Sequence, residues 1–253
     1  MKFIPKVGRA SYEEAKSFRP ISLTSFLLKC LERIVDHHIR DVHLANVPLH
    51  VNQHAYQSGK STVTLLHKVV YDIEKAFAQK QSCLGVFLDI EGAFDNVPFD
   101  AILEAGRSHG ISPMISNWIH QMLKNRYLFS TLRLAGIRKL SVCGCPQGGV
   151  LSPLLWNLVA DTLLRQLNNS GFPTYGFADD YLTLLVGMCI STLFDLMQNA
   201  LQVVEGWCRQ YGLSVNPSKT SIVLFTERRN RNGVRPLRLF DSEIDVTEQV
   251  KYV

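Results

Sequence analysis

The stretch "TYGFADDYLTLL" (174–185) contains two adjacent aspartates that separate two runs rich in apolar residues. The runs on either side are typical of two strands joined as a hairpin. An Asp–Asp pair is a poor hairpin turn compared with Asn–Gly or Asp–Gly. Two adjacent like charges also repel each other unless a cation neutralises them. Asp179 and Asp180 therefore indicate either a turn, where Asp tolerates positive φ, or a metal-binding site.

Length and composition point to a globular protein with a proper core. The chain has 253 residues, of which 46% are hydrophobic and 19% are charged, enough for one larger domain or two lobes. A net charge of +5 is compatible with a polyanionic partner. No apolar run approaches the ~20 residues of a membrane span, and the start "MKFIPKVGRASYEE" lacks a signal-peptide core. We expect no membrane association, no secretion, and a location in the nucleus and cytoplasm.

The six cysteines are scattered and form none of the CxxC or Cys/His spacings of a zinc site. Four of the six lie in apolar segments, which favours reduced thiols in the core.

Apolar residues at helical spacing predict an amphipathic helix over 25–44 and a second helix after Lys60. Ser61 or Thr62 can cap the second helix. Further helices are expected over 98–109, over 113–126 with Ser112 as cap, from Ser152–Pro153 onward, and over 191–211 up to Gly212.

The nearly continuous apolar run at 83–90 predicts a central strand that is buried on both faces and ends at Asp89. A hairpin around Ala135–Gly136 and a strand at 220–225 follow, and 227–233 reads as a solvated basic loop. The mixture without a strict βαβ repeat predicts an α+β sheet with helices on one face. The last residues, "EQVKYV", resemble the middle of a strand, so we expect a fragment.

Asp89 has two interpretations when it is considered alone. A carboxylate at the end of a buried strand is costly unless it is hydrogen-bonded, paired or bound to a metal, and it could also be an N-cap or turn acid. Together with Asp179 and Asp180 it meets the needs of a two-metal site. Hard cations such as Mg²⁺ take carboxylates and substrate phosphates as ligands.

The sequence resembles the reverse transcriptases of non-LTR retrotransposons of the Jockey-like group. The resemblance implies an RNA-directed DNA polymerase that transfers nucleotides from dNTPs to a DNA primer on an RNA template. It implies a right-hand fold across 1–253, with fingers at about 1–80, palm at 81–253, an inserted part near 98–145, and the thumb absent or truncated. Six blocks carry it: "FRPISLTSFLLKCLERIV" (18–35), "NQHAYQSGKST" (52–62), "VFLDIEGAFDNV" (86–97), "CPQGGVLSPLLWNLVAD" (145–161), "YGFADDYLTLL" (175–185) and "GLSVNPSKTSIVLF" (212–225).

The resemblance assigns Asp89 and Asp179 as metal ligands, with Asp180 less direct and the carbonyl of Ile90 completing one shell. The metal would be Mg²⁺, with Mn²⁺ as a possible substitute. The primer 3′-hydroxyl would attack the α-phosphate, and pyrophosphate would leave. Lys219 would protonate or attract the pyrophosphate; a solvated surface lysine is the alternative.

The resemblance also implies a set of nucleotide-binding residues. Phe94 would pack against the sugar and exclude a 2′-hydroxyl, or else be an ordinary core residue. Gln147 and Gly148 would touch the nucleotide and the template base pair, unless they form an ordinary turn. Lys60, where many relatives have Arg, and Arg19 would hold triphosphate oxygens.

The sequence can be compared with three alternative functions. "GKST" (59–62) suggests a P-loop NTPase, but the required Gly is replaced by His54 and no apolar strand precedes it. No GxSxG elbow supports a hydrolase. The stronger alternative is a truncated relic that only binds nucleic acid, because the expected endonuclease and thumb domains are missing. Without a thumb, the affinity for a nucleic-acid duplex should be low and salt-sensitive, because fewer phosphates are neutralised.

Overall fold

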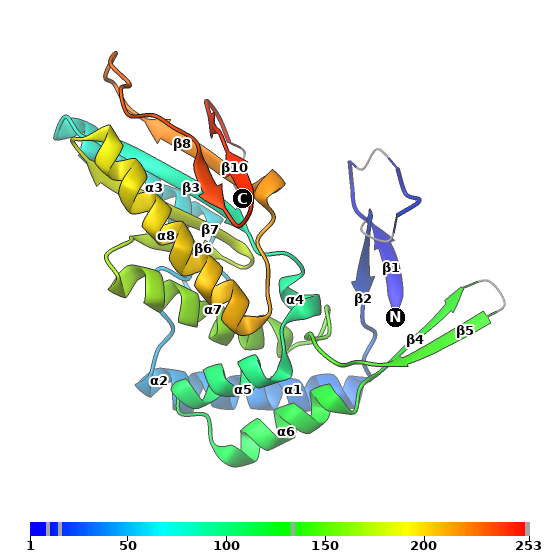
Figure 1. Cartoon of the computed structure of the whole chain (residues 1–253). Helices are drawn as coiled ribbons and strands as arrows, with labels where there is room; N and C mark the ends of the chain where they lie inside the picture. The colour runs from blue at the N-terminus through cyan, green and yellow to red at the C-terminus, as the bar shows by residue number, and fades with distance from the viewer. Residues whose placement is uncertain (9–10, 15–16, 133–134, 251–253) are drawn as a thin grey trace. The chain divides into compact units, whose positions relative to one another are not determined.

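The computed structural model describes residues 1–8, 11–14, 17–132 and 135–250 (Figure 1). The chain consists of two compact units, each built from two stretches of sequence. The first unit contains Met1–Pro48 and Gly92–Leu158, and the second contains Leu49–Glu91 and Val159–Val253. The assignment of fingers and palm stays a prediction, because these units are defined by compactness alone.

The first unit is built mainly of helices with two short hairpins. Ser25 caps its first helix by accepting the amide of Leu28. Ser112 caps another helix that has Pro113 at its first turn, as the sequence predicted. Its helices are α1 (Phe26–His38), the π-helical turn η2 (Ile39–His43), α2 (Leu44–Asn46), α4 (Ala93–Asn96), α5 (Phe99–Ser108), α6 (Pro113–Lys124) and the start of α7 (Ser152–Asn169). Its antiparallel strand pairs are β1 (Lys2–Pro5) with β2 (Phe18–Ile21), and β4 (Tyr127–Leu132) with β5 (Ala135–Leu140).

The second hairpin corrects one prediction. Ala135 and Gly136 lie within β5, where Ala135 pairs with Leu132 and Gly136 with Thr131. The turn is therefore not at Ala135–Gly136, and the connection at 133–134 lies outside the described residues. The β-branched and apolar residues before the turn predict that a hairpin forms, but they do not fix its register.

The second unit is organised around a five-stranded sheet whose central strand is β3 (Ser82–Asp89). The strand order is β11 (Val246–Thr247), β8 (Ser221–Phe225), β3, β7 (Asp180–Gly187) and β6 (Thr174–Phe177). All neighbours are antiparallel except β11, which is parallel to β8. The other elements are α3 (Thr62–Ala78), the end of α7, α8 (Ile190–Tyr211), the 3₁₀ turn η3 (Pro217–Lys219) and the hairpin of β9 (Leu237–Leu239) with β10 (Ser242–Ile244).

Helices cover both faces of this sheet, so the prediction of helices on one face is wrong. On one face Leu65 and Val69 of α3 pack against Phe87 of β3. On the other face, α8 lies against β3 and β7, in front of the sheet in the view of Figure 1. The physical reason is visible in β3 itself: all residues from Ser82 to Leu88 are buried, and alternate side chains of a strand point to opposite faces.

Helix ends in the second unit follow the sequence closely. Ser61 and Thr64 form a reciprocal capping box at the start of α3, and Gly212 ends α8 with a φ of 63°. The strand expected at the end of the chain is wrong for 248–250, which are in no strand, and 251–253 lie outside the described residues. Within the described ranges, no helix is both long and apolar enough to cross a membrane.

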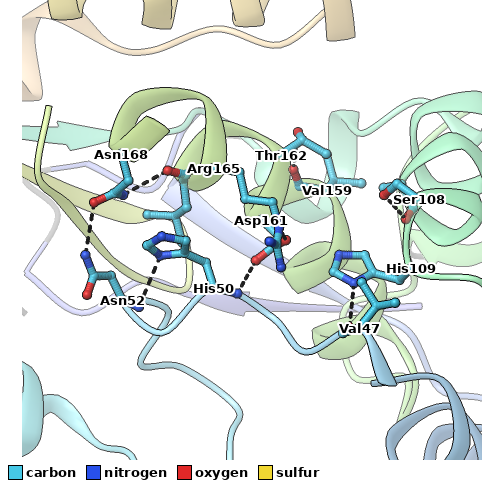
Figure 2. A network of polar contacts seen from close by, with 12 residues as sticks. Val47, His50, Asn52, Ser108, His109, Val159, Asp161, Thr162, Arg165 and Asn168 are labelled. Carbon is cyan, nitrogen blue, oxygen red and sulfur yellow. Dashed lines mark hydrogen bonds and ion pairs between the residues drawn. The ribbon is translucent and has the colours of Figure 1, made fainter. Parts of the chain in front are cut away.

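The segment before α3 is joined to α7 and β6 by partly buried polar groups (Figure 2). The His50 amide and the Arg165 guanidinium both donate to the Asp161 carboxylate. The side-chain amide of Asn52 donates to Asn168 Oδ1 at 3.1 Å, and the backbone of the segment pairs with β6. These contacts hold the block "NQHAYQSGKST" beside the β6–β7 hairpin.

Candidate active site

The β6–β7 hairpin turns through two residues, Ala178 and Asp179, because Asp180 already belongs to β7 and pairs with Phe177. Ala178 has a φ of 58°, a conformation that costs an L-residue with a Cβ about 1–2 kcal/mol. The residue with positive φ is thus the alanine and not an aspartate, so the simple turn interpretation of the two acids is wrong in this respect. Strain of this kind is typical of functional sites.

Asp89 and Asp180 are directly opposite each other on β3 and β7. The amide of Ile90 donates to the carbonyl of Asp179 at 3.0 Å. Because this hydrogen bond joins the neighbouring residues Ile90 and Asp179, Asp89 and Asp180 form a non-hydrogen-bonded pair of the antiparallel ladder. The side chains of such pairs approach each other most closely. Like charges directly opposite each other destabilise a sheet. The end of β3 and β7 therefore concentrates negative charge at one place.

The titration of Asp180 reflects this concentration of charge. Burial raises the pKa of Asp180 to about 6, and the carboxylates of Asp179 and Asp89 add to the rise. Lys219 opposes the rise. All three predicted metal ligands are thus close enough to affect one titrating group.

Lys219 is the cation that the structure places among these acids. Its ammonium donates to both oxygens of the Asp89 carboxylate, at 3.0 and 2.8 Å. The side chain of Asp89 is 26% exposed and that of Lys219 is 48% exposed. Lys219 ends η3, and the backbone of Asn216 at the start of this turn donates to the Asp89 carbonyl at 3.3 Å. The strand end and the turn that carries the lysine are therefore joined.

The donor set suits a divalent cation that is shared with a substrate. Among the described residues, no three His, Cys, Asp or Glu side chains are arranged as a complete metal cage. Magnesium commonly takes only one or two protein carboxylates and completes its shell with phosphates and water. The opposed pair of Asp89 and Asp180 supplies two carboxylates, and Asp179 in the adjacent turn adds a third.

Two further residues of the second unit lie in the block before α3. Lys60 Nζ donates to the carbonyls of Val51 and Gln53 at 2.6 and 2.8 Å, so its ammonium is already engaged. Tyr56 has a φ of 55°, and burial followed by the charge of Asp179 raises its pKa. Sequence reasoning missed Tyr56, since no spacing relates it to an aspartate more than a hundred residues later.

The other predicted nucleotide-binding residues belong to the first unit, where backbone bonds bring three of them together. The amide of Cys145 donates to the carbonyl of Phe94 at 2.6 Å, and the amide of Ser22 donates to the carbonyl of Gln147 at 2.8 Å. A Cβ on Gly148 would lie 3.2 Å from the Ser22 carbonyl. Arg19 lies in β2, which ends just before Ser22.

Gln147 and Phe94 have chemical features of ligand contacts. The side-chain oxygen of Gln147 is buried and has no hydrogen-bond partner among the described residues. Such orphan acceptors are rare in native structures and call for an explanation, such as a missing ligand or water. The ring of Phe94 is partly exposed and packs against Trp156 with 6.3 Å between centroids. Packing on Trp156 fixes the ring without burying it completely.

Comparison with known families decides between the alternatives. The family model described as "Reverse transcriptase (RNA-dependent DNA polymerase)" matches residues 4–253. The chain belongs to the reverse transcriptase family. Reverse transcriptases generally use divalent metal ions and bind RNA templates, which agrees with a carboxylate-rich strand end. Neither the P-loop NTPase nor the non-polymerising relic is favoured.

Sequence relatives of this reverse transcriptase domain come from retrotransposons. The probable RNA-directed DNA polymerase from transposon BS of Drosophila melanogaster is 29% identical over 99% of this chain and 28% of its own length. The RNA-directed DNA polymerase from mobile element jockey of Drosophila funebris is 28% identical over 95% of this chain and 26% of its own length. The resemblance to non-LTR reverse transcriptases is thus confirmed, and the chain spans only about a quarter of these larger proteins.

Solved structures confirm the right-hand polymerase fold. A telomerase from Candida tropicalis in complex with a TWJ fragment of telomeric RNA has a TM-score of 0.59 at 14% identity, covering 88% of this chain and 40% of that one. An apo form truncated from the C-terminal domain has a TM-score of 0.52 at 11% identity, covering 87% and 43%. At such identities the likeness concerns the fold alone. The individual site residues stay predictions.

Proposed function

We propose that this reverse transcriptase domain is the RNA-directed DNA polymerase of a non-LTR retrotransposon. It transfers nucleotides from dNTPs to the 3′-hydroxyl of a DNA primer on an RNA template. The observation that carries the proposal is the cross-strand pair of Asp89 and Asp180 with Asp179 at the adjacent turn. Three carboxylates that destabilise one another are best explained by a cation that binds among them.

The metal is proposed to be Mg²⁺, held by Asp89, Asp179 and Asp180 with the carbonyl of Ile90. When bound, it would activate the attacking hydroxyl and stabilise the charge on the leaving phosphates. Mn²⁺ has similar ligand preferences and is a suitable spectroscopic substitute.

The chain's own side chains supply the remaining functions. Lys219 neutralises Asp89 in the free protein, and we propose that it donates a proton or its charge to the pyrophosphate. Phe94 excludes a 2′-hydroxyl, while Gln147 and Gly148 contact the nucleotide and template base pair. Arg19 contacts triphosphate oxygens. For Lys60, the two carbonyl contacts favour a role in shaping the loop before α3, and contact with phosphate would require at least one of these bonds to break.

The relatives support a proposal for the biological setting. Because these are several times longer than this chain, we propose that the domain works within a polyprotein that also carries a thumb and an endonuclease. Access to a chromosomal target would require the nucleus, and translation of the element RNA would place the protein in the cytoplasm as well.

Primer extension on an RNA template tests the proposal. The chain is incubated with poly(rA)/oligo(dT), dTTP and Mg²⁺, beside Asp179→Ala and the control Asp195→Ala. Asp195 is an exposed acid of the same unit, paired with Arg235. We expect extension by the wild type and the control, and a loss of at least about a hundredfold in Asp179→Ala. Full activity of Asp179→Ala would disprove the metal assignment.

A further inference from the structure

Two charged side chains that the polymerase chemistry does not use converge on the loop 143–151 of the first unit. One is Glu32, which is completely buried on α1. The other is Arg126, which follows α6 and is only partly exposed. Buried charges are costly unless they are paired or hydrogen-bonded, so their partners show what they hold in place.

Glu32 holds the C-terminal end of the loop. Its Oε2 accepts the amide of Val150 at 2.8 Å. Burial raises the pKa of Glu32, and the amides of Val150 and Leu151 oppose that rise. Val150 and Leu151 are the two residues that precede α7. A negative charge near this end of a helix is favoured, because the helix dipole makes the N-terminal end positive. Glu32 therefore holds the backbone directly before α7 from a helix that is more than a hundred residues away in sequence.

Arg126 holds the N-terminal end of the same loop. Its Nη2 donates to the carbonyls of Cys143 and Gly144 at 3.3 and 3.0 Å, and to Ser141 Oγ at 2.6 Å. Its other nitrogens, Nε and Nη1, have no hydrogen-bond partner among the described residues. Arg126 therefore holds the loop backbone through Nη2 alone, at the carbonyls of Cys143 and Gly144. Arg126 and Glu32 also attract each other electrostatically, since each shifts the pKa of the other toward the charged form.

Between these two anchors the loop has little freedom. Ser152 Oγ donates to the carbonyl of Pro146 at 2.8 Å, and the amide of Gly144 donates to the carbonyl of Val97 at 2.7 Å. A Cβ on Gly144 would lie 2.4 Å from the Asp95 carbonyl. The backbone is therefore fixed on both sides of Gln147, whose side-chain oxygen lacks a partner among the described residues.

We infer that Glu32 and Arg126 are positioning residues that hold the loop 143–151 so that Gln147 and Gly148 can accept the incoming nucleotide. The inference rests on the proposed polymerase function, because that function assigns the loop to the nucleotide. Neither residue touches the reacting atoms. Their role is to keep the amide and carbonyl groups around Gln147 in one arrangement before the nucleotide binds, which lowers the cost of binding.

The test uses Arg126→Lys, which keeps the charge but replaces the planar guanidinium with a shorter side chain that ends in a single nitrogen, and Glu32→Gln, which keeps the shape but loses the charge. Steady-state kinetics at saturating primer–template should show a KM for dTTP raised about tenfold in Arg126→Lys and at least about threefold in Glu32→Gln. The kcat and the Kd for primer–template should stay within about twofold. Asp36→Asn on α1, the helix of Glu32, and Lys124→Gln at the end of α6, two residues before Arg126, are controls that should match the wild type.

Hydrogen exchange of the free protein provides a readout that needs no activity. Amides in 147–151 should exchange at least about tenfold faster in both variants, while those of β3 stay unchanged. An unchanged KM for dTTP in an active wild type would overturn the inference, as would exchange that rises uniformly over the chain. A wild type that extends no primer would instead count against the proposed function, and the exchange experiment would still decide whether the two residues hold the loop.

Discussion

Lys219 donates to both carboxylate oxygens of Asp89, which is 130 residues earlier in the chain. The lysine occupies the oxygens that the proposed metal would need. Lysine and metal should therefore compete for Asp89. In Lys219→Met we expect Mn²⁺ to bind up to about fivefold more tightly, since partly exposed ion pairs of this kind contribute up to about 1 kcal/mol. The Kd for Mn²⁺ is measured by electron paramagnetic resonance on the free protein.

Lys68→Met is the matched control for this experiment. Lys68 forms a similar ion pair with Asp72 on α3, and its side chain is 47% exposed, close to the 48% of Lys219. This variant should bind Mn²⁺ like the wild type. If both variants and the wild type share one Kd, Lys219 does not compete with the metal.

Phe94 should control the choice of sugar. Replacing Phe94 by alanine removes the ring that packs on Trp156 and leaves space for a 2′-hydroxyl. We expect the ratio of kcat/KM for dTTP over UTP to fall by at least about tenfold, with dTTP use itself reduced less. An unchanged ratio would assign Phe94 to core packing. Phe99→Ala on α5 is a suitable control for loss of an aromatic ring in the same unit.

Gly144, in the loop 143–151, should be less replaceable by alanine than Gly110. Gly144 and Gly110 both have positive φ, 81° and 72°, but only Gly144 has backbone atoms where a Cβ would lie. Gly110→Ala should lower the free energy of unfolding by about 1–2 kcal/mol through the backbone conformation alone. Gly144→Ala adds a steric cost of about 1–3 kcal/mol. Urea unfolding of both variants measures the difference, and equal losses would refute the packing described for this loop.

Cys189 should be the most reactive thiol of the chain near neutral pH. Hydrogen bonds from Ser191 and Thr192 lower the pKa of Cys189 to about 7, whereas burial raises that of Cys145 to about 12. The thiolate is the reactive form, so alkylation of Cys189 should rise with pH and reach half its limiting rate near pH 7. Mass spectrometry after a short iodoacetamide pulse gives the rates. Exposed Cys30 is the comparison, and faster labelling of Cys145 than of Cys189 would contradict the structure.

Local patterns explain why much of the fold could be predicted from the sequence. Ser61, Ser112 and Gly212 mark helix ends through bonds to residues only a few positions away. The apolar run of β3 predicted a buried strand that ends at Asp89, and the six blocks predicted the polymerase fold. The helix ends and the buried strand depend on short-range hydrogen bonds and on periodicity, both of which can be read along the chain. The polymerase fold was predicted only through the resemblance of the six blocks to a known family.

The remaining features depend on contacts between distant residues. Three features join residues that no spacing relates: the packing of helices on both faces of the sheet, the ion pair between Lys219 and Asp89, and the hydrogen bond from the Val150 amide to Glu32. Ala178 rather than an aspartate takes the positive φ of the hairpin, because pairing between β6 and β7 places the turn one residue earlier. Register and long-range ion pairs are set by tertiary packing, so a single sequence does not contain a local signal for them.

We propose that Asp89 binds the metal ion that RNA-directed DNA synthesis requires. The most direct measurement is primer extension on poly(rA)/oligo(dT) with dTTP and Mg²⁺, with the wild type beside Asp89→Asn, a substitution that keeps the side-chain shape and removes the charge. We expect the wild type to extend the primer and Asp89→Asn to extend it at a rate at least about a hundredfold lower. Equal extension by the two proteins would contradict it.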